Sequence, residues 1–452
     1  MTSYPYTPTT LRTTAKPRPW VPFKPHEGHI EVPPLPFKPR SDDLLGTYNI
    51  STHIIPAANP RVNPNIPVPE PPPRSSKKRT KKDIKDLGIE LMEQQARLGE
   101  DGYSGVTDER LLWNCVNRYV KRDKEAKVRT KGITLFLVHG VGFPKEICET
   151  NLCYLLAACG VIDEIWSWES VQHGDSALLN RQNLSAVDWT DDARDMANFL
   201  INYMPEEVET SSLPIQLDRV PASIGKSRQR SGFSSRTLAV AGHSYGGCPV
   251  TLAALHFPAL FSSMILIDAT LDPFEGFVWE NNQYLVGAAL VRRDQWPSRE
   301  DALRSFKSSP TFSVWHPDVL RLYVDFALYE DESGCVRLKV PPVHEALLTA
   351  NPQARRGTWE LMEKLDEKIE LLWIFPGKES LDVSMLMELR KQRAWRRPAN
   401  SSNIIFKSAG HLIPQESPEE LARVMADFLN RKYDISSGNQ SSRIAYTNGC
   451  CA

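Results

Sequence analysis

The chain has 452 residues, of which 41% are hydrophobic and 24% are charged, and this composition provides enough apolar material for a sizeable core. Its 54 Lys and Arg residues nearly balance its 55 Asp and Glu residues, so the charge gives no indication of nucleic-acid binding. The chain contains no run of about 18 apolar residues, so no transmembrane helix is predicted. Its first residues lack the apolar core of a signal peptide. Its eight cysteines show no metal-binding spacing. We therefore expect a soluble, intracellular, globular protein without a metal site.

Proline and polar residues divide the chain into segments. About half of the 35 prolines lie before residue 74, and because proline lacks a backbone donor we expect residues 1–43 to form a disordered arm. The basic run at 74–82 indicates a solvated linker, with a nuclear address or a phosphate-binding patch as alternatives. Residues 205–235 are rich in Ser, Pro and Arg and predict a flexible insertion, and the polar residues 435–452 predict a flexible tail.

Short apolar runs bounded by glycine or polar residues predict strands that are buried on both faces, as in a parallel sheet. These runs lie at 133–138, 164–168, 236–241, 264–267, 370–375 and 403–406. Another strand is predicted at 48–55, whereas residues 111–120 show helix-like or mixed spacing. Helical patterns such as 191–203 and 419–429 separate most of the strands. Strands that alternate with helices predict an α/β protein with a doubly wound, mostly parallel sheet.

An insertion divides the predicted core. Residues 273–366 are apolar and helical in pattern, and we expect them to form a helical lid between the first part of the core, residues 44–272, and the second part, residues 367–434. The aromatic residues of this segment are Phe274, Phe277, Trp279, Tyr284, Trp296, Phe312, Trp315, Tyr323 and Phe326. Their density favours an apolar pocket under the lid, with plain packing of the lid onto the core as the alternative for any single side chain.

The sharpest local signal is a G-x-S-x-G motif centred on Ser244, with Gly242 and Gly246 as its glycines. It lies between a predicted strand and an apolar helical pattern, which is the context of a nucleophile elbow. In such an elbow a tight turn points the serine hydroxyl out of the sheet. A Cβ atom at position 242 or 246 would collide with the neighbouring strand and helix, so the motif requires glycine at both positions.

Backbone N–H groups near the elbow are candidate donors for an oxyanion. Tyr245 supplies one directly after the candidate nucleophile. The second is expected in the glycine-containing segment after the strand at 133–138, at Val141 or, as the next choice, at Gly142.

The candidate general base is His411. It follows the last predicted strand and precedes a helix start at Ser417 and Pro418. A loop at the C-terminal edge of a parallel sheet lets a histidine reach a serine that follows a different strand. The other histidines, including His243 within the elbow and His139 at a strand end, lack this placement.

These residues resemble the α/β-hydrolase superfamily, and more narrowly a fungal group that includes toxin-biosynthesis hydrolases and a yeast peroxisomal lipase. The segments that carry the narrower resemblance are 50–57, 112–119, 139–146, 173–180 and 188–195, and the resemblance covers roughly residues 45–434. It implies hydrolysis of an ester-like bond by a Ser-His-acid triad without a cofactor. It does not identify the substrate.

The acid of the triad stays open at this point. The resemblance points to a position after the strand at 370–375, but Ser380 stands there, with Glu379 and Asp382 close by. Some lipases of this fold carry the acid after the strand that follows the elbow strand, where this chain has Asp268. We therefore take Asp268 as the first choice and Glu379 and Asp382 as alternatives.

Three functions fit these features. The first is a serine esterase or lipase acting on a small apolar ester through an acyl-enzyme. The second is an acyltransferase or product-release enzyme of secondary metabolism, because the motifs do not separate water from an alcohol as the acceptor. The third is a non-catalytic binding module that uses the same pocket as a receptor.

The last residues give an expectation about location. They are Gly449, Cys450, Cys451 and Ala452, which form neither a peroxisomal import tripeptide nor a prenylation motif. We therefore expect a cytoplasmic rather than a peroxisomal protein. Palmitoylation of Cys450 or Cys451 is the alternative to an unmodified tail.

Overall fold

The computed structural model describes most of the chain. The described residues are 2–26, 30–62, 65, 66, 68, 69, 80–100, 110–122, 132–186, 188–273, 275–378 and 384–433. Three sequence-based expectations fall outside them: the larger part of the basic run at 74–82, the alternative acids Glu379 and Asp382, and the tail at 435–452.

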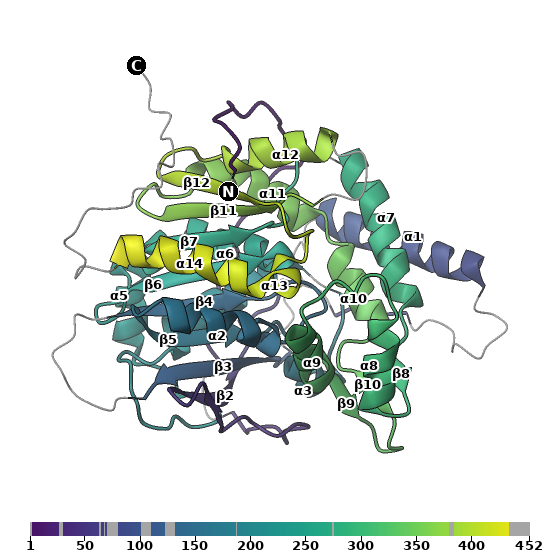
Figure 1. Cartoon of the computed structure of the whole chain (residues 1–452), viewed down its shortest axis with the longest axis horizontal. Helices are drawn as coiled ribbons and strands as arrows, with labels where there is room; N and C mark the ends of the chain where they lie inside the picture. Colours follow the sequence, from purple (N-terminus) through teal and green to yellow (C-terminus); the bar gives the residue numbers. More distant parts are fainter. Residues whose placement is uncertain are drawn as a thin grey trace.

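A nine-stranded sheet runs through the centre of the molecule, in the strand order β1-β2-β3-β5-β4-β6-β7-β11-β12 (Figure 1). Its strands are β1 (Asp43–Leu44), β2 (Tyr48–Pro56), β3 (Trp113–Lys121), β4 (Ile133–Val138), β5 (Ile162–Trp168), β6 (Leu238–His243), β7 (Ser263–Ile267), β11 (Glu370–Pro376) and β12 (Ser401–Phe406). The neighbours from β5 to β12 pair in parallel, and the pairs among β1, β2, β3 and β5 are antiparallel. The predicted α/β fold with a mostly parallel sheet is confirmed.

The apolar runs of the sequence correspond closely to the strands of the sheet. The run at 133–138 coincides with β4, and each of the other predicted runs overlaps one strand. The helix-like or mixed spacing at 111–120 was misleading, because most of these residues form β3. Nearly all of β3 is buried, so both of its faces carry side chains that avoid water, and the alternation typical of a half-exposed strand is absent.

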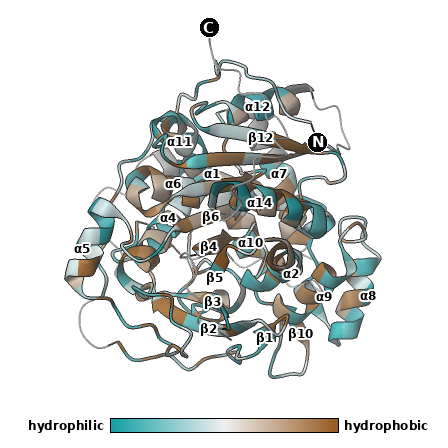
Figure 2. Cartoon of the chain, turned by 60° about the vertical axis from the view of Figure 1, so that its left-hand side comes forward, coloured by the Kyte–Doolittle hydropathy of each residue, from teal (hydrophilic) through white to brown (hydrophobic). Residues whose placement is uncertain are grey.

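Helices cover both faces of the sheet. The helices outside the segment between β7 and β11 are α1 (Lys81–Glu100), α2 (Glu149–Ala158), α3 (Gly174–Leu179), α4 (Trp189–Asn198), α5 (Ala222–Ser231), α6 (Gly247–His256), α12 (Ser384–Ala394), α13 (Ile413–Glu416) and α14 (Pro418–Tyr433). On β4, Leu135 and Leu137 belong to the apolar cluster shared with α2 and α14, whereas Phe136 and Val138 belong to the cluster shared with α4 and α6. Figure 1 shows α2 and α14 side by side, and Figure 2 shows hydrophobic colouring along the central strands.

The segment between β7 and β11 forms the region expected to be a lid. Its elements are α7 (Glu275–Val291), β8 (Gln295–Trp296), α8 (Arg299–Lys307), α9 (Pro317–Phe326), β9 (Leu328–Glu330), β10 (Val336–Leu338), α10 (Pro342–Thr349) and α11 (Gln353–Leu361). The helical pattern did not reveal the small antiparallel sheet β8-β10-β9. Trp296, Trp315 and Tyr323 form an apolar cluster with Phe143 and Ile147, which follow β4, so this segment packs onto the core beside the end of β4.

The N-terminal segment corrects one expectation. The described part of residues 1–43 lies against the core instead of forming a disordered arm. The backbone N–H of Tyr4 donates to Asn403 Oδ1 at 2.7 Å, and Tyr4 is only 5% exposed. Trp20 stacks on His256 with 4.1 Å between ring centroids. Proline prevents a regular ladder of hydrogen bonds, but the aromatic residues between the prolines still gain stability when they leave water.

The segment 205–235 corrects a second expectation, namely that it forms a flexible insertion. It contains α5, and Arg228 on this helix is buried. The Arg228 guanidinium donates to the backbone carbonyls of Leu200 at 3.1 Å and Met204 at 2.8 Å. These carbonyls lie at the end of the helical segment formed by α4 and the π-helical turn Phe199–Tyr203, and helix ends leave such groups unpaired. The arginine thus ties the insertion to the core.

Candidate active site

The elbow motif forms the predicted tight turn between β6 and α6. Ser244 has a backbone φ of +53°, in the left-handed region that residues other than glycine rarely adopt. A Cβ on Gly242 would lie 2.9 Å from the backbone nitrogen of Gly247, and a Cβ on Gly246 would lie 2.5 Å from the carbonyl oxygen of His139. Glycine is therefore required at both positions, against the start of the helix at one and against the end of β4 at the other.

His411 lies within hydrogen-bonding distance of Ser244. Its Nε2 is 2.8 Å from Ser244 Oγ, although the two residues are 167 positions apart in the sequence. His411 belongs to the loop between β12 and α13, where the N–H of Gly410 donates to the Glu416 carboxylate at 2.9 Å. The structure thus brings the candidate nucleophile and the candidate base together at the C-terminal edge of the sheet.

Asp268 is placed on the other side of the His411 ring. His411 Nδ1 is 2.6 Å from Asp268 Oδ2. Asp268 follows β7 and has a φ of +38°, and its backbone N–H donates to the carbonyl of Ile374 on β11 at 2.7 Å. Of the three acids considered from the sequence, Asp268 is the one that lies within the described residues, and its carboxylate faces the imidazole.

Two arginines of α12 set the charge of the Asp268 carboxylate. Arg390 Nη2 is 3.4 Å from Asp268 Oδ2, and Arg393 Nη1 is 3.5 Å from Oδ1. Burial by itself raises the pKa of Asp268, but Arg390, the hydrogen bond from His411 and Arg393 outweigh burial and lower this pKa. The carboxylate is therefore ionised at neutral pH and suited to stabilise a positively charged imidazole. No spacing in the sequence pointed to these arginines.

The candidate oxyanion loop follows β4, which lies next to the elbow strand β6, with Val138 opposite Gly242. Gly142 has a φ of +80°, so a side chain at this position would be strained. Among the described residues we find no protein acceptor for the backbone N–H of Val141 or of Gly142. Both groups therefore remain candidate oxyanion donors.

His243 is a residue of this site that the sequence analysis set aside. Its Nε2 lies 3.0 Å from the backbone carbonyl oxygen of His411, and since a carbonyl only accepts, the Nε2–H donates. Burial, followed by the proximity of His411, lowers the pKa of His243 to about 3, so the ring is neutral near pH 7. Its position inside the elbow motif was the only available signal, because its partner lies 168 residues away.

Side chains of the predicted lid border the candidate oxyanion loop. The Glu345 carboxylate lies 3.2 Å from the place a Cβ on Gly142 would occupy, and it pairs with Arg292 at 2.5 Å. The rings of Tyr323 and Phe143 contact each other edge to face. Tyr284 points away from the core, with 75% of its surface exposed. Of the aromatic side chains of the predicted lid that the structure describes, only part is thus near the loop.

Among the described residues we looked for metal sites, membrane-spanning helices and other hollows. They contain no group of three or more His, Cys, Asp or Glu side chains arranged to hold a metal ion. No helix among them is both long enough and apolar enough to span a bilayer. A surface hollow lined by residues such as Pro17, Trp20 and Gly357 lies at the N-terminal segment and does not include Ser244.

The fold agrees with comparisons to known proteins. The model of the alpha/beta hydrolase family matches residues 135–424. The chain belongs to the α/β-hydrolase family. This match includes the elbow, Asp268 and His411, and it supports a hydrolase, as the sequence resemblance indicated.

Curated relatives and a solved structure refine the position within the family. The chain is 31% identical over 396 residues to "Type I acyl-CoA thioesterase mpaH'" of Penicillium brevicompactum, which covers 73% of this chain and 84% of that protein. It is 27% identical over 218 residues to "Abhydrolase domain-containing protein AFT2-1" of Alternaria alternata, which covers 42% of this chain and 82% of that protein. The peroxisomal α/β-hydrolase Lpx1 of Saccharomyces cerevisiae has a TM-score of 0.59 at 17% identity and covers 88% and 94% of the two chains. The expected relation to fungal α/β-hydrolases is confirmed.

Proposed function

We propose that the protein is a serine hydrolase that cleaves an ester-like bond of an apolar acyl substrate through an acyl-enzyme. The observation that carries this proposal is the continuous hydrogen-bonded series from Ser244 Oγ to His411 Nε2 at 2.8 Å and from His411 Nδ1 to Asp268 at 2.6 Å. A nucleophile, a base within reach of it and an ionised acid that orients the base are the three parts that nucleophilic acyl transfer requires.

Each step of this reaction has a group to perform it. Ser244 Oγ attacks the carbonyl carbon while His411 Nε2 takes the hydroxyl proton, and Asp268 stabilises the resulting imidazolium. The backbone N–H groups of Tyr245 and of Val141 or Gly142 bind the oxyanion. His411 then protonates the leaving group, whose departure leaves an ester on Ser244. A water molecule then gives a proton to His411 and attacks this ester, and His411 passes the proton to the departing Ser244 Oγ as the acid is released.

The nature of the substrate rests on the surroundings of the loop after β4. Phe143 follows this loop directly and packs against Trp315 and Tyr323, so a buried apolar cluster lies next to the loop on the side of the predicted lid. This supports an apolar acyl group. The name of the relative from Penicillium brevicompactum supports acyl thioesters as one class of substrate. A thiolate is a better leaving group than an alkoxide, and the same residues serve both.

The test combines covalent labelling with turnover. A fluorophosphonate probe is expected to label the wild-type chain and not Ser244→Ala, because only an activated serine hydroxyl reacts with it. p-Nitrophenyl esters and CoA thioesters of matched acyl length then measure which bond is cleaved and which chain length is preferred. Labelling of Ser244→Ala at the wild-type rate, or hydrolysis that survives in this folded variant, would contradict the proposal.

A further inference from the structure

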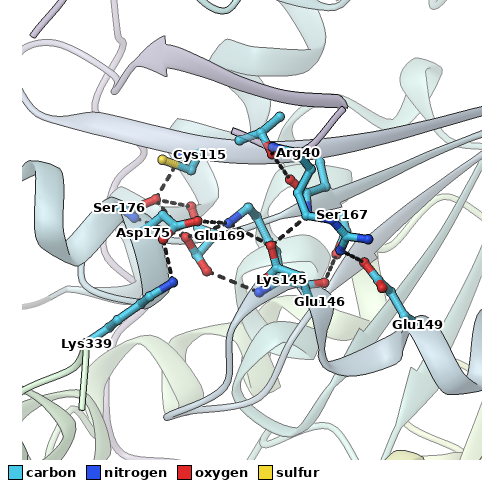
Figure 3. A network of polar contacts seen from close by, with 12 residues as sticks. Arg40, Cys115, Lys145, Glu146, Glu149, Ser167, Glu169, Asp175, Ser176 and Lys339 are labelled. Atoms are coloured by element: carbon cyan, nitrogen blue, oxygen red, sulfur yellow. Dashed lines mark hydrogen bonds and ion pairs between the residues drawn. The ribbon is translucent and has the colours of Figure 1, made fainter. Parts of the chain in front are cut away.

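A lysine with no role in the proposed reaction is buried just after the candidate oxyanion loop in the sequence. Lys145 Nζ has no exposed surface and lies 2.7 Å from Asp175, 3.0 Å from Glu146 and 3.6 Å from Glu169 (Figure 3). Taking this many charges out of water costs more than packing apolar residues in the same space. Stability alone therefore does not account for the cluster.

The main chain of Lys145 is fixed as firmly as its side chain. Its N–H donates to Glu169 Oε1 at 3.1 Å, and its carbonyl oxygen accepts from Ser167 Oγ at 2.6 Å. Lys145 comes three residues after Gly142, so the segment that carries the candidate oxyanion donors is short and is held at this end. An oxyanion hole needs this rigidity, because its donors must lie within about 2.7–3.1 Å of the oxyanion.

The same cluster reaches the predicted lid. Asp175, on α3, binds Lys145 with one carboxylate oxygen and accepts from Lys339 Nζ with the other at 2.6 Å. Lys339 directly follows β10 of the lid segment, and Figure 3 shows it approaching Asp175 from a different side than Lys145. One carboxylate thus joins the oxyanion loop and the lid. It also joins two sequence motifs, 139–146 and 173–180, whose role the elbow and the histidine do not explain.

We propose that Lys145 is a positioning residue for the oxyanion loop, and that Asp175 couples its position to the lid through Lys339. The proposal rests on the proposed function, because it assigns the cluster to the geometry of the same reaction. With the Lys339 contact made, Asp175 and Lys145 hold the loop in the conformation that binds the oxyanion. Without the Lys339 contact, Asp175 loses one of its two cationic partners, and the oxyanion loop gains conformational freedom.

The experiment separates positioning from plain stability. Lys339→Met removes only the lid contact, and Asp175→Asn weakens both contacts. Lys145→Arg keeps the charge of the loop residue, whereas Lys145→Met removes it. Arg337→Met is the matched control, since Arg337 lies on β10 and pairs with Asp331 of the same segment without contacting Asp175. For each folded variant, kcat per labelled serine, KM for a p-nitrophenyl ester and the affinity for an alkyl boronic acid, which mimics the tetrahedral intermediate, are measured.

We expect Lys339→Met and Asp175→Asn to lower kcat at least tenfold and to weaken boronic acid binding in parallel, with KM changed less than threefold. Lys145→Arg should retain more activity than Lys145→Met, and Arg337→Met should match the wild type. Variants with lower melting temperatures but wild-type kcat and boronic acid affinity would overturn the proposal and leave the serine mechanism intact. If Lys145→Met does not fold, Lys339→Met and Asp175→Asn decide. A wild-type chain that neither labels nor turns over would instead reject the proposed function itself.

Discussion

The Nε2–H group of His243 donates a hydrogen bond to the backbone carbonyl of His411, with 3.0 Å between nitrogen and oxygen. This contact links the elbow directly to the main chain of the loop that carries the candidate base. The two imidazole rings lie 5.4 Å apart. The residue before the nucleophile therefore fixes where His411 stands, while Asp268 fixes how its ring is oriented.

Replacement of His243 by leucine should reduce turnover without abolishing it. The loop would lose the hydrogen bond to the His411 carbonyl, and we expect kcat/KM to fall about tenfold, equivalent to about 1.4 kcal/mol. His53→Leu is the matched control, because His53 is also buried and its Nδ1 contacts a backbone carbonyl, that of Pro214, far from the site. Equal losses of activity in the two variants would contradict a specific role for His243.

The identity of the acid can be tested with amide isosteres. Asp268→Asn should lower kcat by about three to four orders of magnitude, because the amide neither stabilises the imidazolium nor favours the required tautomer. Glu379→Gln and Asp382→Asn should each stay within about tenfold of the wild type. Steady-state kinetics on one ester substrate decides among them. A collapse of activity in Glu379→Gln or Asp382→Asn together with an active Asp268→Asn would assign the role to the other acid.

Removal of residues 1–26 should destabilise the protein, although the proline pattern alone predicts little effect. The deletion removes Tyr4 from its buried contact with Asn403 and Trp20 from His256. Burial of one large side chain is worth about 1.5–3 kcal/mol, so the melting temperature should fall by several degrees. Deletion of residues 435–452, predicted from sequence to be a flexible tail, is the control. Identical thermal transitions for the two truncated chains would show that the N-terminal contacts add no stability.

Buried neutral histidines should make the fold sensitive to acid. Burial is the largest cause that lowers the pKa of His53 to about 4, from an ordinary value of 6.5. Between these two values the unfolded chain binds a proton that the native chain does not, so the contribution of His53 is complete above pH 6.5 and is lost as the pH falls toward 4.

Urea unfolding of the wild type and His53→Leu at several pH values measures this effect. The difference in free energy of unfolding between the two proteins should fall by about 3 kcal/mol across the window, since each pH unit is worth about 1.4 kcal/mol. Other titrating groups cancel in the difference. A difference that stays constant from pH 7 to pH 4.5 would show that His53 titrates normally in the native state.

Local patterns in the sequence were enough to predict the fold class and two members of the candidate site. The strand at 133–138 could be recognised because a buried parallel strand is a short, continuous apolar run. Ser244 could be recognised because the glycines around it are needed by the turn itself, and His411 because a loop before a helix start places it at the sheet edge. Each of these signals lies within a few neighbouring residues.

The tertiary structure decided what depends on distant partners. Asp268 lies 143 residues from His411, and only the parallel pairing of β7 with β11 and of β11 with β12 brings the ends of their strands together. The N-terminal segment packs on residues almost 400 positions away, and composition contains no record of such contacts. Lys and Asp residues are common in any sequence, and no local pattern marks Lys145, Asp175 or Lys339. Only the tertiary structure shows that their side chains are buried together. The sequence determines which residues can perform the chemistry, whereas the pairing of strands and the packing of distant segments determine which of these residues come into contact.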